Sequence, residues 1–147
     1  TEGGNEPVFL RIIAAIVVAA FIGIQFYTVE RTNPPVTGDL KEPAEVKEVL
    51  QRACYDCHSN ETKWPFYSYV APFSWLVVKD VDEGRKELNF SNWHRITRAK
   101  QAKIKKEVWE EVQKEQMPLW YYVPLHPEAK LSAEDKDILR KWSRGRL

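Results

Sequence analysis

The stretch RACYDCHSNETKWPFYSYVAPFSW, residues 52–75, contains both cysteines of the 147-residue chain. Cys54 and Cys57 are separated by two residues, and His58, one of three histidines, follows the second cysteine directly. The chain has no third cysteine that could pair with either thiol. Two thiols and an imidazole within five consecutive positions indicate a metal-binding, cofactor-binding or redox site. The flanking segments must then form the fold around that site.

Three kinds of chemistry use such a cluster. In a C-x-x-C-H pattern the two thiols attach haem covalently and the adjacent imidazole binds the iron. A thioredoxin-like dithiol is usually found among alternating strands and helices, which the neighbouring sequence does not show. A structural zinc site usually takes its ligands as two separated pairs, and the second pair is missing here. The pattern therefore favours one covalent haem c, attached at Cys54 and Cys57, with His58 as an axial ligand.

The N-terminal part of the chain contains a long apolar run, VFLRIIAAIVVAAFIGIQFYTV, at residues 8–29. A helix of about 22 residues extends roughly 33 Å, which is enough to cross the hydrocarbon core of a bilayer. A cleaved signal peptide has a shorter apolar region and a small-residue cleavage site, which the sequence around Tyr27 and Glu30 does not resemble. We therefore predict an uncleaved signal anchor at residues 1–30 that spans a membrane once.

The rest of the chain divides into a linker and a helical domain. Residues 31–42, RTNPPVTGDLKE, have the composition of an extended linker. Apolar residues at helical spacing then predict helices within four ranges, and no segment alternates as a strand does. Ser132, three residues before Asp135, predicts a capping box at the start of the last helix. We expect an all-α, small cytochrome c-like haem domain at residues 43–147, with its helices within 43–58, 73–88, 99–116 and 131–145.

The second axial ligand of the iron separates electron carriers from haem enzymes and sensors. The chain has one methionine, Met117, which follows a predicted helix and precedes Pro118. A thioether there can return over the haem, and ligation by histidine and methionine raises the reduction potential and leaves no open position on the iron. A lone methionine is otherwise ordinary core packing. Met117 is the preferred ligand, and His126 and His94 are its rivals.

Charge excludes some classes of partner. The formal net charge is +1 and the sequence pI is about 7.7. A nucleic-acid-binding domain usually carries a strongly basic surface, so no nucleic acid is expected as a partner. The apolar run instead predicts a lipid bilayer as one partner.

The chain also resembles a known family over nearly its whole length. Residues 54–93, CYDCHSNETKWPFYSYVAPFSWLVVKDVDEGRKELNFSNW, are similar to the bacterial haem-binding domain family of membrane-anchored mono-haem c-type cytochromes, and so are residues 29–40 and 117–139. The shared pattern is Cys-x-x-Cys-His-Ser-Asn, Trp-Pro, Pro-x-Ser-Trp and Gly-Arg…Leu-Asn-Phe-Ser-x-Trp. The family has Met-Pro-Pro where this chain has Met117, Pro118 and Leu119.

The resemblance implies a location and further site residues. It implies a haem domain on the periplasmic side of a bacterial inner membrane, because c-type haem attachment takes place there. Four residues of the shared motifs are candidates to line the haem or to meet its propionates: Arg85, Trp64, Trp75 and Trp93.

These observations predict an electron carrier and not an enzyme. The expected function is single-electron transfer between membrane redox complexes, or within one as a subunit, with redox proteins as partners and no small-molecule substrate. A tether would raise the effective concentration of those partners. Two alternatives stay open: a peroxidase-like or gas-sensing haem protein with a displaceable distal ligand, and a structural subunit whose haem mainly holds the fold.

Overall fold

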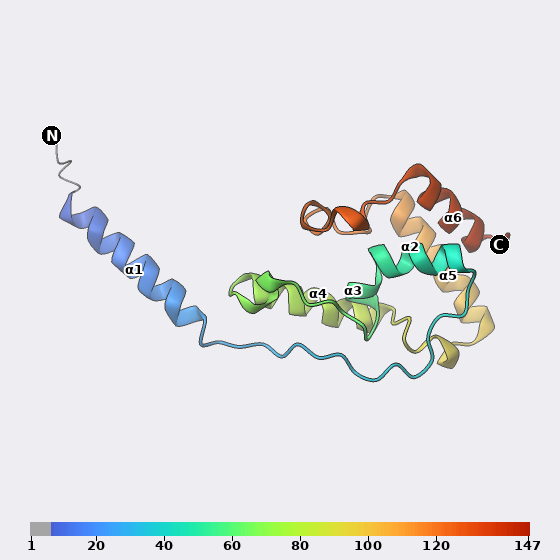
Figure 1. Cartoon of the computed structure of the whole chain (residues 1–147), viewed down its shortest axis with the longest axis horizontal. Coiled ribbons are helices and arrows are strands. Elements are labelled where there is room, and N and C mark those ends of the chain that lie inside the picture. Colours follow the sequence, from blue (N-terminus) through green and yellow to red (C-terminus); the bar gives the residue numbers. More distant parts are fainter. Residues whose placement is uncertain (1–6) are drawn as a thin grey trace. The chain divides into compact units, whose positions relative to one another are not determined.

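The computed structural model describes residues 7–147, and the part of the predicted anchor at residues 1–6 lies outside them. Within the described residues every regular element is a helix, apart from one isolated bridge between Gly38 and Asn92 (Figure 1). The α-helices are α1 (Val8–Ile24), α2 (Ala44–Ala53), α3 (Tyr55–His58), α4 (Phe73–Glu87), α5 (Arg98–Gln113) and α6 (Ala133–Ser143), and 3₁₀ turns lie at Phe66–Tyr69, Trp93–Arg95, Val123–Leu125 and Pro127–Ala129. The predicted all-α class is confirmed.

The chain forms two compact units. The first unit consists of residues up to Arg31 together with Trp64–Lys79, and the second consists of Thr32–Lys63 together with Asp80–Leu147. Helix α4 contributes its first half to one unit and its second half to the other. The sequence motif of interest and all the α-helices from α2 onward, except the start of α4, belong to the second unit.

Helix α1 is shorter than the sequence predicted. It has 17 residues and ends at Ile24, so it is roughly 25 Å long at 1.5 Å per residue. Beyond Ile24 the hydrogen bonds join residues three apart instead of four, since Phe26 N–H donates to Gly23 O and Tyr27 N–H donates to Ile24 O. No helix within residues 7–147 is long and apolar enough to cross a membrane. The prediction of a spanning helix is therefore corrected.

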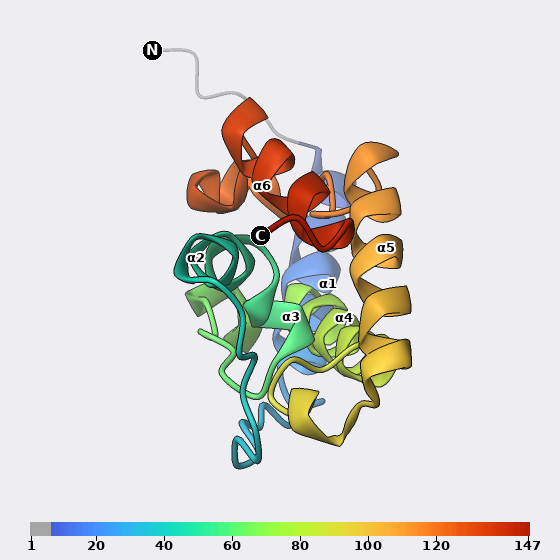
Figure 2. The same cartoon turned by 90° about the vertical axis from the view of Figure 1, so that its right-hand side faces the viewer.

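The core of the second unit is built from the amphipathic stripes that the sequence predicts. Helix α6 packs against both α5 and α2 (Figure 2), and the predicted capping box at its start is present, with Ser132 and Asp135 bonded reciprocally. Tyr55, Phe90, Trp93 and Trp142 form a continuous series of ring contacts through this core. The buried core cluster is Leu40, Val46, Val49, Leu50, Tyr55, Phe90, Trp93, Ile104, Val112, Leu139 and Trp142.

The predicted linker is extended in the structure but well attached to the second unit. Thr37 and Gly38 donate their backbone N–H groups to Ser91 O at 3.1 and 2.9 Å. A Cβ atom at Gly38 would lie 1.9 Å from Nδ1 of His94, so a larger residue there would displace that ring. The segment therefore follows a fixed path along the second unit from Thr32 onward.

Candidate functional site

The CYDCH motif is presented by a single short turn of helix. Helix α2 ends at Ala53, and α3 starts at Tyr55 after a break at Cys54, whose φ is −128°. The carbonyl oxygen of Cys54 accepts from the N–H groups of His58 at 2.9 Å and Cys57 at 3.2 Å. This turn brings both thiols and the imidazole to one cavity.

Helix α4 lies closely against this turn because residue 84 is glycine. A Cβ atom at Gly84 would lie 2.6 Å from the carbonyl oxygen of Cys57 and 3.1 Å from its Cβ. Real side chains do not tolerate such a contact without a shift of the backbone. The second half of α4 therefore packs directly against the backbone of the motif.

The imidazole of His58 has a defined orientation. Its Nδ1 lies 3.1 Å from the carbonyl oxygen of Leu88, so the neutral ring donates Nδ1–H and leaves the Nε2 lone pair available. Burial lowers the pKa of His58, although hydrogen bonds to backbone carbonyls partly oppose this. A neutral imidazole oriented by a backbone carbonyl is the usual arrangement of a histidine that binds a metal.

The two thiols are free, and both cysteines are half-buried. Burial raises the pKa of Cys54 to about 12, and a smaller contribution comes from the neighbouring Cys57. Burial, followed by the charges of Asp56 and Asp80, likewise raises the pKa of Cys57 to about 12. Redox-active dithiols have lowered thiol pKa values, so the shift here is opposite to the thioredoxin-like alternative.

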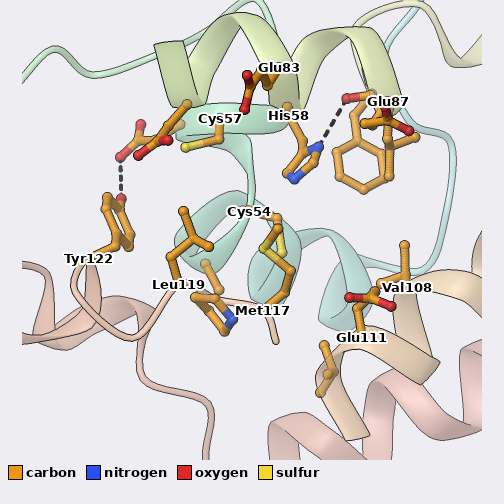
Figure 3. Close-up of a pocket in the computed structure, with 18 of the residues that line it drawn as sticks. Cys54, Cys57, His58, Glu83, Glu87, Val108, Glu111, Met117, Leu119 and Tyr122 are labelled. Atoms are coloured by element: carbon orange, nitrogen blue, oxygen red, sulfur yellow. Dashed lines mark hydrogen bonds between the residues drawn. The ribbon is translucent and has the colours of Figure 1, made fainter. Parts of the chain in front are cut away.

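All three motif side chains line one cavity of about 700 Å³ in the second unit (Figure 3). That volume lies within the roughly 300–1,000 Å³ typical of small-molecule and cofactor sites. Its apolar walls come from α2, α5 and the segments that follow α4 and α5. The apolar lining residues are Ala53, Leu88, Phe90, Ile104, Val108, Val112, Pro118 and Leu119.

Met117 lines the same cavity, and the two rival histidines do not. Figure 3 shows Met117 and His58 at different walls of the cavity, with Cys54 between them. His94 instead lies against Gly38. His126 stacks on Tyr122, with ring centroids 4.0 Å apart, and lies 3.2 Å from Glu128. Of Met117, His126 and His94, the three candidates for the second axial ligand, Met117 is the one that lines the cavity.

The position of Met117 follows from the way α5 ends. Glu115 adopts a positive φ of 58°, which reverses the chain after the last helical turn. The N–H groups of Gln116 and Met117 then both donate to Glu111 O, at 2.9 and 3.3 Å. We call residues 115–125 the Met117 loop.

Two tyrosines of the Met117 loop connect it to the opposite wall. The hydroxyl of Tyr122 donates to Asp56 Oδ2 at 2.7 Å, and that of Tyr121 donates to Asp80 Oδ2 at 3.0 Å (Figure 3 shows the former). Burial and the bond to Asp80 raise the pKa of Tyr121 to about 12, so it stays a donor at neutral pH. The sequence did not point to this pair of contacts, although buried tyrosine hydroxyls usually find a hydrogen-bond partner.

The charged residues around the cavity are acidic. No lysine or arginine is among the residues that line it within the described part of the chain. Negative charge near a metal centre is one of the factors that set its potential. The acidic lining residues are Asp56, Asp80, Glu83, Glu87, Glu107 and Glu111.

Arg85 is not among the residues that line the cavity. Its Nε donates to Ser59 O at 2.7 Å, and its terminal nitrogens donate to Thr32 O, Asn33 Oδ1 and Thr62 Oγ1. The guanidinium thus joins the linker to the residue after the motif. Its role beside the haem propionates stays a prediction.

The predicted tryptophans also lie outside the cavity lining. Trp93 is buried in the aromatic core, at 3% exposure. Trp64 and Trp75 belong to the first unit, where the indole N–H of Trp75 donates to Tyr27 O at 3.1 Å. None of the three is among the residues that line the cavity, and the roles predicted for them beside the haem stay predictions.

The donors present fit a haem better than an isolated metal ion. Cys54, Cys57, His58 and Met117 offer two thiols, a neutral imidazole and a thioether in one largely apolar cavity. In the part of the chain that the structure describes, no group of three or more His, Cys, Asp or Glu residues is arranged to hold a metal ion. The zinc alternative therefore gains no support from the geometry.

Comparison with known proteins agrees with this chemistry. A family model described as a haem-binding domain matches residues 19–145. Comparisons with curated proteins and with solved structures found no match. The chain belongs to the haem-binding domain family.

Proposed function

We propose that this member of the haem-binding domain family carries one covalent haem c and transfers single electrons. The observation that carries the proposal is that Cys54, Cys57, His58 and Met117 line one cavity. A haem bound there would supply an iron that alternates between two oxidation states. The protein itself would not be an enzyme.

The chain's own residues have distinct parts in this proposal. Cys54 and Cys57 would hold the group by thioether bonds, and His58 would bind its iron through Nε2, oriented by the carbonyl of Leu88. Met117 would occupy the second axial position. The apolar residues of the cavity would exclude water, which favours electron transfer over chemistry at an open site.

The peroxidase-like and gas-sensing alternatives require Met117 to leave the iron. Its loop is fixed at both ends of the cavity, by backbone bonds to Glu111 and by the hydroxyl groups of Tyr121 and Tyr122. These contacts favour a closed, six-coordinate iron. Slow binding of carbon monoxide by the reduced protein is the expected result, whereas rapid binding would support the alternatives.

We further propose that the protein works at a bacterial inner membrane, with its haem domain in the periplasm and redox proteins of a membrane complex as partners. The support is the surface of α1, whose residues from Val8 to Gly23 are all exposed and are apolar apart from Arg11. A helix that is apolar on every side needs an apolar surrounding. Co-sedimentation of the haem protein with phosphatidylcholine vesicles tests this association, and a chain that stays in the supernatant would contradict it.

Covalent attachment is tested by mass spectrometry of the denatured protein, produced in cells that have the c-type attachment machinery. The mass of the chain should increase by one haem, and the Cys54→Ser/Cys57→Ser variant should lack the increase. Each single variant should keep at most one thioether bond and a much lower yield of haem protein. A parent chain that releases all its haem on denaturation would contradict the proposal.

A further inference from the structure

Residues 66–76 of the first unit bury small side chains and expose large apolar ones. Their buried positions are Ser68 at 0%, Ala71 at 3% and Ser74 at 5% exposure. Most of their exposed positions are aromatic or aliphatic, and Phe66 reaches 83% exposure. Soluble proteins place such residues the other way round, so an exposed apolar patch of this kind marks an interaction surface.

The exposed side chains come from two short elements that follow one another in the chain. They belong to the 3₁₀ turn at Phe66–Tyr69, to its extended C-cap Val70 and to the first turn of α4. We call this set the aromatic face: Phe66, Tyr69, Val70, Phe73 and Leu76, with exposures of 83, 60, 37, 60 and 44%.

The segment is joined directly to the end of α1. The side-chain amide of Gln25 donates to Ala71 O at 3.1 Å, and its oxygen accepts from Ala71 N–H at 2.9 Å. The ring of Trp75 meets that of Tyr27 edge-on, at 5.6 Å between centroids, and its indole N–H donates to Tyr27 O. Both elements belong to the same compact unit, so the aromatic face and the end of α1 have a fixed relation.

The residues next to this junction suit a membrane interface. Phe26 and Tyr27, just beyond α1, are 83 and 70% exposed. Arg31 lies over the ring of Tyr69 at 4.2 Å and donates to Ser68 O at 2.9 Å. Aromatic and long cationic side chains are characteristic of the level at which lipid headgroups meet acyl chains.

We propose that the aromatic face is a lipid-docking surface that lies in the bilayer interface beside the end of α1. Lipid is the proposed occupant because α1 is exposed and apolar on every side, and a single groove on a protein would cover only one side of it. The aromatic face is joined to the end of α1 and extends its apolar surface. The inference rests on the proposed membrane association of α1, but not on the haem. The unit thus holds the protein at the membrane by two elements instead of one.

Photolabelling from within the bilayer tests the proposal. The full-length haem protein is reconstituted in phosphatidylcholine vesicles that contain a small fraction of phosphatidylcholine with a diazirine on its acyl chain. After illumination, adducts are mapped by mass spectrometry. Adducts are expected on α1 and on residues 66–76, but not on Trp120, which is 81% exposed in the second unit. Adducts on α1 alone, or no more on residues 66–76 than on Trp120, would overturn the proposal.

Matched variants give a second test. Phe66→Ser/Phe73→Ser should reduce the adducts on Tyr69 and Val70 at least about threefold. Each substitution removes an aromatic ring that lipid would bury, and this burial would hold the segment in the interface. The control Trp120→Ser should leave them unchanged. Unchanged labelling in the double variant, or cross-linking of the aromatic face to a second copy of the chain in place of lipid, would refute lipid docking.

The visible spectrum of each variant is recorded alongside the labelling. If the proposed haem c is wrong, its absorption bands are missing from the spectrum, while the adducts still form on residues 66–76. If lipid docking is wrong, the adducts on residues 66–76 are missing and the absorption bands are unchanged. The two proposals therefore fail in different measurements.

Discussion

The two units of this molecule use their aromatic residues in opposite ways. In the second unit Tyr55, Phe90, Trp93 and Trp142 are buried and pack ring to ring behind the cavity. In the first unit Phe66, Tyr69 and Phe73 are exposed while Ser68 and Ser74 are buried. The same residue types thus form a core in one unit and a surface in the other. Amino-acid composition alone does not show which aromatic residues are buried and which are exposed. The burial of the small residues beside them does.

The largest difference between the units is expected at their helical glycines. Gly84 faces Cys57 O, where an added Cβ would lie 2.6 Å away, whereas Gly23 has nothing within 4 Å. Gly84→Ala should destabilise the second unit by about 1–3 kcal/mol through overpacking and should reduce the yield of haem protein. Urea unfolding followed by the haem absorbance measures this.

Gly23→Ala is the matched control for that substitution. It should leave the unfolding midpoint of the second unit unchanged, because its methyl group meets open space and alanine favours the helix. Equal midpoints for the parent and Gly84→Ala would show that α4 does not lie rigidly against the motif.

A second contrast concerns tyrosine hydroxyl groups. The Tyr122 hydroxyl bonds Asp56 across the cavity, and a hydrogen bond to a charged group contributes about 1.5–3 kcal/mol. Tyr122→Phe should therefore loosen the Met117 loop, and imidazole should bind the ferric iron about tenfold faster or more. Stopped-flow absorbance measures the rate.

Tyr69→Phe provides the comparison in the first unit, where Tyr69 is exposed. It should bind imidazole at the parent rate. If Tyr122→Phe also reacts at the parent rate, the tyrosines do not position Met117 and the loop must be held by its backbone alone.

The smallest effect is expected from acid. Burial raises the pKa of Asp135, but hydrogen bonds from Ser132 and Arg52 outweigh it, and the net pKa lies below the usual value. A carboxylate with a lowered folded-state pKa contributes stability above its unfolded pKa of about 3.9 and loses that contribution as the pH falls through the folded value. The contribution is about 1 kcal/mol for a capping box with a partly buried ion pair.

Asp135→Asn should therefore lower stability at pH 7 and differ less from the parent at pH 2–3. Urea unfolding at a series of pH values gives the comparison. Asp137→Asn, at an exposed position in the same helix, should show a smaller pH-dependent change. If the parent and Asp135→Asn differ by the same free energy of unfolding at every pH, the Asp135 carboxylate does not stabilise the fold through a lowered pKa.

The parts of the fold that the sequence predicted well are those with local signals. Helical spacing located α2, α4, α5 and α6 within a few residues, and Ser132 with Asp135 identified the start of α6. The C-x-x-C-H spacing likewise identified the side chains that meet in the cavity. The parts it missed depend on long-range contacts. The side chain of Gln25, at the end of α1, bonds Ala71, which is 46 residues away, and no local sequence pattern predicts that pair.

Arg85 shows the same limit at the level of a single side chain. The sequence places this cation near the motif but does not reveal that its guanidinium bonds Ser59 and Thr32. Trp75 shows the same limit, since its partner Tyr27 is 48 residues earlier. The roles of both residues beside the haem stay predictions.

The most direct test of the central claim is the visible spectrum of the purified ferric protein. Ligation by His58 and Met117 predicts a weak long-wavelength band from sulfur bound to iron. The band should disappear in Met117→Ala and persist in His126→Ala, whose side chain lies against Tyr122 outside the cavity lining. A parent spectrum without the band, or a band that survives in Met117→Ala, would contradict the account of a closed electron-transfer site.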